Sequence, residues 1–129
     1  MKNLLDKLLE NSYGVYSGVK VSAIVKTKAG EFSGVNVENS AFPSGICAER
    51  NAIFHAVTQG MKVNDLMEVH LTSSLKEKNL YPCAACLQVM LEFMPSDGKL
   101  YMYHNDEIKV HTLKELIPYG VTSESFEWK

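Results

Sequence analysis

Two short motifs contain residues that could hold a metal ion and do chemistry beside it. The first, C-A-E-R, holds Cys47 and Glu49; the second, P-C-A-A-C, holds Cys83, which is 36 positions after Cys47, and Cys86. These are all three cysteines of the chain. Three thiolates can bind zinc tetrahedrally with one position open, whereas a structural zinc site usually takes a fourth protein ligand. Water in the open position has its pKa lowered to roughly 7, so the motifs predict a hydrolytic zinc site.

Two charged residues beside Cys47 could assist such a site. Glu49 lies two residues from Cys47, close enough to move the protons that a hydrolysis requires. Its alternative role is that of an ordinary acid in a first helical turn, but adjacency to a metal ligand favours the chemical role. Arg50 is the only arginine, against twelve lysines. A guanidinium donating to ligand sulfurs would offset part of the negative charge of three thiolates, and a surface ion pair is the alternative.

Asn36 and Glu38 form a second candidate site just upstream of the first cysteine motif. Side chains two residues apart on a strand point the same way. A carboxylate accepts hydrogen bonds and an amide both donates and accepts, so the pair could bind hydroxyl groups. A polar strand end without a ligand is the alternative interpretation.

Other roles for the cysteines need different partners. They could be buried apolar side chains, and P-C-x-x-C alone could be half of a structural zinc site or a redox pair. A closed zinc site would need one of the four histidines: His55, His70, His104 and His111. Three of these fall in or near predicted strands, and His55 lies two turns into the helix that begins at Cys47. We therefore expect hydrogen-bonded or solvated histidines and an open zinc site.

The composition limits the partners of the protein. The chain has 129 residues, 46% of them apolar, and a net charge of −2, which predicts a single domain over residues 1–129. The odd cysteine count and the lack of an apolar leader favour a cytoplasmic protein. No stretch approaches the roughly 20 apolar residues of a membrane span, and no basic stripe offers a nucleic-acid footprint. We expect a small uncharged substrate and neither a membrane nor a nucleic-acid partner.

Hydrophobic periodicity predicts the elements that must position these residues. An amphipathic helix opens the chain, the first strand is half-buried and pairs with the second as a hairpin, and two further strands flank an Asn105-Asp106 turn. Helices are expected at 1–10, 47–59 and 83–93, and strands at 19–26, 32–37, 67–72, 100–104 and 107–110. This order of helices and strands is that of an α/β layered domain.

All three cysteines fall at the beginnings of predicted helices. Cys47 starts one helix, and Cys83 and Cys86 lie in the first turn of another, where residues three apart share a face. The partial positive charge of a helix N-terminus lowers the pKa of a thiol, which favours the thiolates that a metal needs. Pro82 suits a helix entry, since its missing N–H would be unpaired there.

The combination of C-A-E-R and P-C-x-x-C is the zinc-deaminase signature. In this respect the chain resembles the cytidine deaminases of the small, homotetrameric, three-cysteine type. The resemblance runs in order over nearly the full length, from Tyr16-Ser17 through N-V-E-N at 36–39 and both cysteine motifs to Leu113–Pro118. It implies a three-layer αβα fold with a five-stranded mixed sheet.

The resemblance also implies roles for the candidate residues. Cys47, Cys83 and Cys86 would bind Zn²⁺, and a hydroxide would attack C4 of cytosine. Glu49 would move protons between the water, the ring nitrogen and the leaving amine, giving uridine and ammonia in pyrimidine salvage. The pair at 36 and 38 would hold the ribose 3′-hydroxyl. Neighbouring subunits of a homotetramer would complete each site, with Phe42, Tyr119 and Phe126 as the available aromatic residues.

Three positions depart from the usual pattern of these enzymes. Val19 and Val121 stand where an aromatic residue usually reaches the base, and Leu87 stands where arginine usually precedes Gln88. The zinc chemistry is unaffected by these changes. They make a blasticidin-S-type or other modified cytosine nucleoside the alternative substrate, and a non-catalytic zinc-binding module is the alternative from another class.

Overall fold

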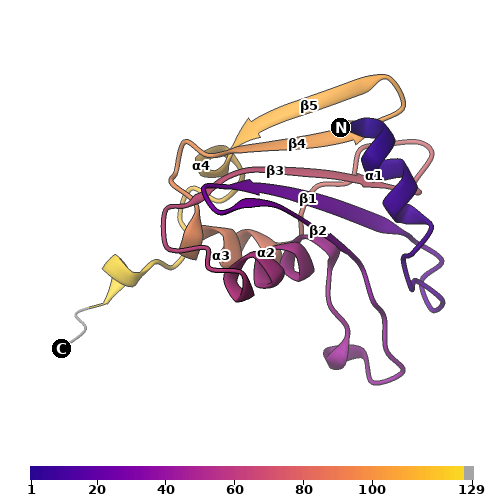
Figure 1. Cartoon of the computed structure of the whole chain (residues 1–129), viewed down its shortest axis with the longest axis horizontal. Helices are drawn as coiled ribbons and strands as arrows, with labels where there is room; N and C mark the ends of the chain where they lie inside the picture. The colour runs from indigo at the N-terminus through magenta and orange to yellow at the C-terminus, as the bar shows by residue number, and fades with distance from the viewer. Residues whose placement is uncertain (127–129) are drawn as a thin grey trace.

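The fold is a five-stranded mixed sheet with helices on both faces, seen in a computed structural model that describes residues 1–126 (Figure 1). The predicted domain also includes residues 127–129, which lie outside the described residues. The elements are α1 (Lys2–Leu9), β1 (Val21–Thr27), β2 (Gly30–Val35), α2 (Ala48–Thr58), β3 (Leu66–Ser73), α3 (Ala84–Phe93), β4 (Lys99–His104), β5 (Glu107–Thr112) and α4 (Leu113–Leu116), with 3₁₀ turns at Phe42–Ser44 and Ser123–Ser125. The predicted αβα fold class is confirmed.

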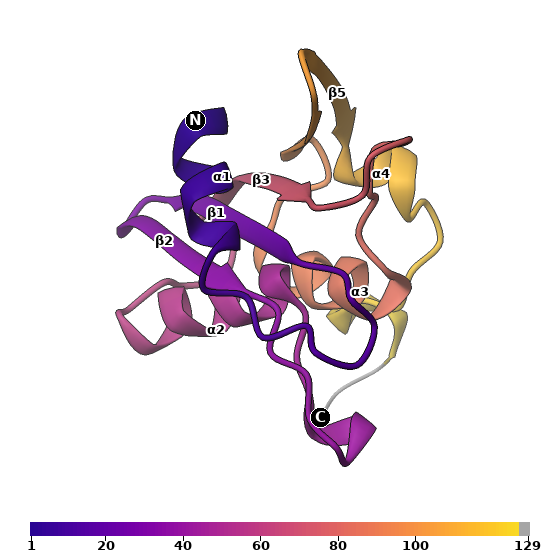
Figure 2. The ribbon, with the colours of Figure 1, turned by 90° about the vertical axis from the view of Figure 1, so that its right-hand side faces the viewer.

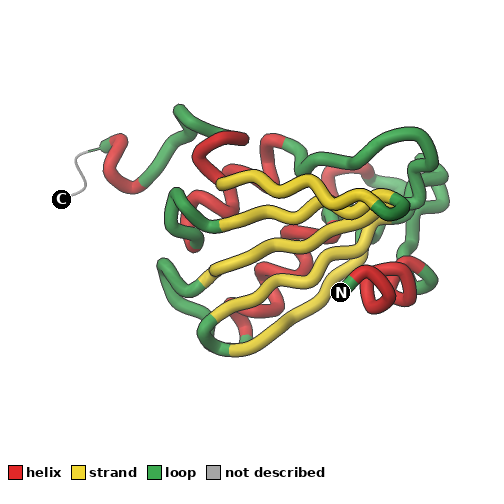
Figure 3. The backbone as a smooth tube through the Cα atoms, turned by 90° about the horizontal axis from the view of Figure 1, so that it is seen from above, coloured by secondary structure: helices red, strands yellow, loops and turns green. Residues whose placement is uncertain are grey.

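The strands lie side by side in the order β2-β1-β3-β4-β5 (Figure 3). The pairs β1–β2, β1–β3 and β4–β5 are antiparallel, and β3–β4 is parallel. A parallel pair needs a crossover connection, and α3 supplies it between β3 and β4. The crossover brings the start of α3, with its two cysteines, to the same side of the sheet as α2 (Figure 2).

Both hairpins turn through the residues that the sequence indicates. His104 pairs with Glu107 across Asn105-Asp106, and Asn105 has the positive φ of 54° that such tight turns require. Thr27 pairs with Gly30 across two residues, and Gly30 has a φ of 127°, a conformation that glycine adopts without strain. Local turn chemistry therefore favours the registers of these two hairpins, β1–β2 and β4–β5.

The main core lies between the sheet and the two helices α2 and α3. Inward residues of the strands meet the apolar faces of both helices, and the fully buried members include Ala23, Val25, Ala52, Ile53, Val69, Leu71, Met90, Leu100 and Met102. Burial of these side chains is the principal driving force that holds the two helices against the sheet. The starts of α2 and α3 thereby come into contact range.

The opposite face of the sheet is covered by α1, which makes the prediction of a half-buried first strand wrong. Leu5 of α1 packs on Ile24 and Tyr103 in a second, smaller core. Ser22, expected on a solvent face, is fully buried, and its hydroxyl donates to the Leu5 carbonyl at 2.7 Å. The N-terminal helix α1 thus covers the face of β1 that the alternation of its residues assigned to solvent.

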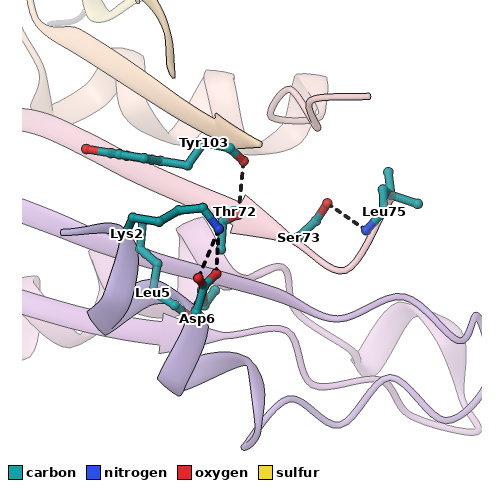
Figure 4. A network of polar contacts seen from close by, with 8 residues as sticks. Lys2, Leu5, Asp6, Thr72, Ser73, Leu75 and Tyr103 are labelled. Atoms are coloured by element: carbon teal, nitrogen blue, oxygen red, sulfur yellow. Dashed lines mark hydrogen bonds and ion pairs between the residues drawn. The ribbon is translucent and has the colours of Figure 1, made fainter. Parts of the chain in front are cut away.

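Polar contacts lie within α1 and within the sheet on this side of the molecule (Figure 4). On α1, Lys2 Nζ pairs with Asp6 at 2.8 Å, one turn apart. Thr72 Oγ1 donates to the Tyr103 carbonyl at 2.9 Å, across the parallel pair. His70 is buried, stacks on a tyrosine ring, and contacts Tyr103 Oη at 2.8 Å through Nδ1. This histidine is hydrogen-bonded, as expected.

Two local features differ from the sequence expectation. Alternation along β3 places Met67 on the same face as the core residues Val69 and Leu71, yet Met67 is 44% exposed and Leu66 is fully buried, because the pairing of β1 with β3 shifts register at Lys26/Thr27. The short helix α4 was not expected. It begins at a capping box in which Thr112 Oγ1 accepts from the Glu115 N–H at 3.2 Å and Glu115 accepts from the Thr112 N–H at 2.9 Å.

Close packing of β2 against α2 depends on Gly34. A Cβ at this position would lie 2.5 Å from Ala52 N and 2.7 Å from Ala48 O, in backbone that cannot give way cheaply. We expect Gly34→Ala to destabilise the fold by about 1–3 kcal/mol, as overpacking does, and to weaken zinc binding because α2 carries Cys47 at its start. Urea unfolding measures the first effect and metal analysis the second.

Ser33→Ala, on the exposed neighbour of Gly34, is the matched control, with an expected change within about 0.5 kcal/mol. An unfolding midpoint for Gly34→Ala equal to that of Ser33→Ala would contradict the proposed close approach.

Candidate active site

Three cysteine sulfurs converge where α2 and α3 begin. Cys47 is the N-cap residue of α2, Cys83 is the N-cap residue of α3, and Cys86 lies in the first turn of α3. The Cys47 and Cys83 sulfurs are 3.9 Å apart, the Cys83 and Cys86 sulfurs are 3.5 Å apart, and all three lie within 4.8 Å of one another. The structure thus brings together the three predicted ligands.

The spacing of the sulfurs fits zinc. Ligands about 2.3 Å from a tetrahedral zinc ion lie about 3.8 Å from each other, close to the two sulfur separations above. Among the cysteine, histidine and acidic side chains of residues 1–126, these three cysteines form the group placed to hold a metal ion, and no histidine belongs to it. Three sulfur donors leave one tetrahedral position for a non-protein ligand.

The electrostatics around the sulfurs favour a thiolate at Cys47. Its pKa is lowered to about 5 because the sulfur accepts hydrogen bonds from the Cys86 thiol and from the Arg50 guanidinium. The pKa of the Cys86 thiol is raised, since it donates to Cys47 and is buried. Metal binding would displace the protons of the thiols that it engages.

Arg50 lies against the sulfurs and not in a surface ion pair. Its Nη2 donates to Cys47 Sγ at 3.3 Å, and the guanidinium pKa is raised by hydrogen bonding to Cys47 and Cys86. The Nε atom is buried and has no hydrogen-bond partner among the described residues. This placement suits a cation that offsets part of the thiolate charge.

We expect Arg50→Ala to lower turnover by about 10–100-fold while most of the zinc is retained, because groups that hydrogen-bond metal ligands typically contribute this much. Arg50→Gln should lose less, since its amide can still donate to a sulfur. Steady-state rates and metal content of the two variants measure the effect. Equal and negligible losses would contradict a role for the guanidinium at the sulfurs.

Glu49 is buried within the first turn of α2. It is 3% exposed, and burial raises the pKa of its carboxyl group to about 7. The neighbouring Cys47 thiolate acts in the same direction. A carboxyl group with this pKa can both accept and return a proton near neutral pH, which is what an acid–base catalyst needs.

A cavity of about 600 Å³ opens beside these residues. Its wall combines the cysteine motifs with three other segments, and includes Tyr16, Ser17, Val19, Asn36, Glu38, Phe42, Cys47, Glu49, Arg50, Tyr81 and Cys83. Segments far apart in the sequence thus meet at one cleft. The predicted residues of both candidate sites lie in it, apart from Cys86, which is buried behind the wall.

The side chain of Asn36 is largely committed to backbone groups. Its Oδ1 accepts from the Val21 N–H at 2.8 Å and also from the Ser12 hydroxyl, and its Nδ2 donates to the Val19 carbonyl at 2.9 Å. An amide oxygen has two lone pairs and an amide nitrogen two hydrogens. One N–H of Asn36 is left for a ligand, and its oxygen is occupied.

The carboxylate of Glu38 is held by the neighbouring loop. Its Oε1 accepts N–H bonds from Tyr16 at 2.8 Å and Ser17 at 3.0 Å, and its Oε2 accepts the Ser17 hydroxyl at 2.5 Å. These bonds, the Ser17 hydroxyl first, lower the pKa of Glu38 and keep it ionised. The Ser17 contact was not expected from the sequence, where no pattern links residues 21 positions apart.

The three unusual positions have different surroundings. Val19 lines the cavity, Leu87 is buried in the main core, and the Val121 carbonyl accepts a bond from Gln88 Nε2 at 2.7 Å. Aromatic rings line the cavity even so. Tyr16 and Phe42 meet edge to face with centroids 6.1 Å apart, and Tyr81 lies in the wall beside Cys83.

An αβα fold with three cysteines placed to hold a metal ion and a buried carboxyl of raised pKa at a cleft fits a zinc-dependent hydrolase. The family model that describes the cytidine and deoxycytidylate deaminase zinc-binding region matches residues 1–102. The chain belongs to this family. The predicted family, enzyme class and zinc cofactor are thereby confirmed.

Named relatives agree with this assignment. A cytidine deaminase of Mycoplasma genitalium is 36% identical over 117 residues, which cover 90% of this chain and 88% of the relative. A cytidine deaminase of Halalkalibacterium halodurans is 35% identical over 117 residues, covering 89% and 86%. The crystal structure of cytidine deaminase from Burkholderia pseudomallei superimposes with a TM-score of 0.85 at 28% identity, covering 92% and 94%.

Proposed function

We propose that the protein hydrolyses cytidine and deoxycytidine to uridine and deoxyuridine, with release of ammonia. The observation that carries the proposal is the placement of three cysteine sulfurs beside the buried Glu49 at one open cavity. The similarity to cytidine deaminases over most of their length supports the choice of substrate. We also propose a role in pyrimidine salvage in the cytoplasm, which is consistent with this activity.

The residues of the site divide the chemistry between them. Cys47, Cys83 and Cys86 would hold zinc, which would supply a water molecule of lowered pKa. Glu49, with its pKa of about 7, would take the two protons of the water in turn, passing one to the ring nitrogen and the other to the leaving amine. Arg50 donates to Cys47 and reduces the negative charge that the thiolates place near the nucleophile.

Asn36 and Glu38 present one donor and one acceptor to the cavity. One amide N–H and one carboxylate lone pair remain after the contacts described above. This set suits a single hydroxyl group, which would accept from Asn36 and donate to Glu38, in place of the paired hydroxyls considered from the sequence. We assign it to the ribose 3′-hydroxyl.

A substrate panel tests the proposed function. Cytidine and deoxycytidine should lose their ultraviolet absorbance with release of ammonia, whereas single-stranded DNA should not react. Turnover of blasticidin S without turnover of cytidine would favour the modified-nucleoside alternative. Zinc-loaded protein that deaminates no cytosine nucleoside would leave a non-catalytic zinc-binding module.

Among the described residues, no helix is long and apolar enough to cross a membrane.

We expect a homotetramer in which neighbouring subunits close each other's cavities, because pockets normally bury most of a ligand and this cavity is open on one side. Phe42 and Tyr119 are 75% and 97% exposed and could reach a neighbour, as could Phe126. Light scattering should give four times the chain mass of 14.4 kDa.

Shared sites can be tested by mixing variants. Tyr119 does not line the cavity of its own chain. If it serves a neighbour, Tyr119→Ala should lose activity, and reassembly with inactive Glu49→Ala protein should restore part of it. A fully active monomer would contradict the tetramer.

A further inference from the structure

We infer that Ser17 is a positioning residue for nucleoside recognition, because its hydroxyl group fixes the carboxylate of Glu38 with one acceptor site left toward the cavity. The inference rests on the proposed function, in which Glu38 accepts the ribose 3′-hydroxyl. It assigns a role to a loop residue that lies outside the zinc motifs and 21 positions before Glu38.

The contacts of Ser17 leave its hydroxyl no hydrogen for a substrate. A serine hydroxyl has one hydrogen, and here it is donated to Glu38 Oε2 at 2.5 Å. Ser17 Oγ also accepts the Val19 N–H at 3.0 Å. Ser17 therefore lines the cavity without a donor to offer, and it acts on a ligand through Glu38.

Ser17 holds both oxygens of the Glu38 carboxylate. Its backbone N–H, together with that of Tyr16, occupies Oε1, and its hydroxyl occupies Oε2. A carboxylate has about four acceptor sites, so three are used and one, on Oε2, remains. Bonds to both oxygens fix the plane of the carboxylate and hence the direction of this last site.

Removal of the hydroxyl should change recognition without changing the fold. Ser17 is exposed, and the two N–H bonds to Oε1 do not depend on its side chain. Oε2 of Glu38 would then have two vacant acceptor sites. The carboxylate group could rotate, since only the hydrogen bonds to Oε1 would still hold it. A substrate hydroxyl would meet a mobile acceptor that water also solvates.

The test compares Ser17→Ala with the unaltered protein on cytidine and on 3′-deoxycytidine, with zinc content measured throughout. For cytidine we expect KM to rise on the order of tenfold, as for loss of a well-placed bond to a charged group, with kcat within about twofold. For 3′-deoxycytidine, which lacks the hydroxyl, kcat/KM should be the same for both proteins. Ser17→Thr, which keeps the hydroxyl group, should restore most of the KM for cytidine.

Ser74→Ala is the matched control, since the exposed Ser74 hydroxyl accepts the Lys20 N–H at 2.9 Å and, among the described residues, makes no hydrogen bond to Glu38. It should leave KM for both nucleosides unchanged. A loss in Ser17→Ala that is equal for the two nucleosides, or no loss for either, would overturn the inference while leaving the proposed function standing. Failure of the unaltered protein to deaminate cytidine would overturn the proposed function itself and is detected before any variant is compared.

Discussion

Glu49→Gln should lower the turnover of cytidine by at least about 10²–10⁴-fold, the usual contribution of one positioned acid–base group, while zinc and fold are retained. Glutamine fills the same buried space but cannot carry a proton between the nucleophile, the ring nitrogen and the leaving amine. The 3% exposure of Glu49 and its pKa of about 7 make it the group in the cavity wall suited to this task.

Steady-state kinetics with metal analysis of the same preparation check this expectation. Gln59→Ala, at the exposed end of the same helix, is the control and should keep full turnover. Turnover of Glu49→Gln above about a tenth of the unaltered level would place the proton transfer on another group.

Replacement of any one cysteine by alanine should abolish both zinc binding and deamination. The three sulfurs are the ligands placed to hold the metal in the described part of the chain, so loss of one leaves two. The fall in zinc affinity should exceed the roughly 10–100-fold typical of changes outside the ligands themselves. Metal analysis of Cys83→Ala after gentle purification should give a zinc content near zero, against one per chain in the unaltered protein.

The neighbouring exposed residue offers a control for helix α3. Ala85→Ser lies between the two cysteines of this helix and should retain zinc and turnover. A Cys83→Ala protein that keeps stoichiometric zinc would show that the metal is held by other ligands.

The zinc site could be predicted from the sequence because its geometry is local. Cys83 and Cys86 are three apart at a helix start, and Cys47 opens another helix, so pairing of two helix N-termini was enough to bring the sulfurs together. The order of helices and strands followed from periodicity in the same way. The capping box of α4, T-x-x-E at 112–115, is likewise a local sequence pattern typical of a helix start.

Features that depend on long-range packing could not be predicted. The burial of Ser22 depends on α1 lying across the sheet, and nothing in the alternation of β1 shows that a helix will cover its second face. The raised pKa of Glu49 depends on burial by the whole domain. The saturated oxygen of Asn36 and the Ser17 contact of Glu38 depend on how the loop at residues 12–21 meets the end of β2.

The central claim is hydrolytic deamination at the three-cysteine site, and isotope labelling tests it most directly. Zinc-loaded protein is incubated with cytidine in water enriched in ¹⁸O, and uridine and ammonia are measured together. The account predicts that each uridine gains one ¹⁸O, at C4, that ammonia is released in equal amount, and that Glu49→Gln protein forms almost no product. Zinc-loaded protein that forms no uridine, or forms uridine without the label, would contradict it.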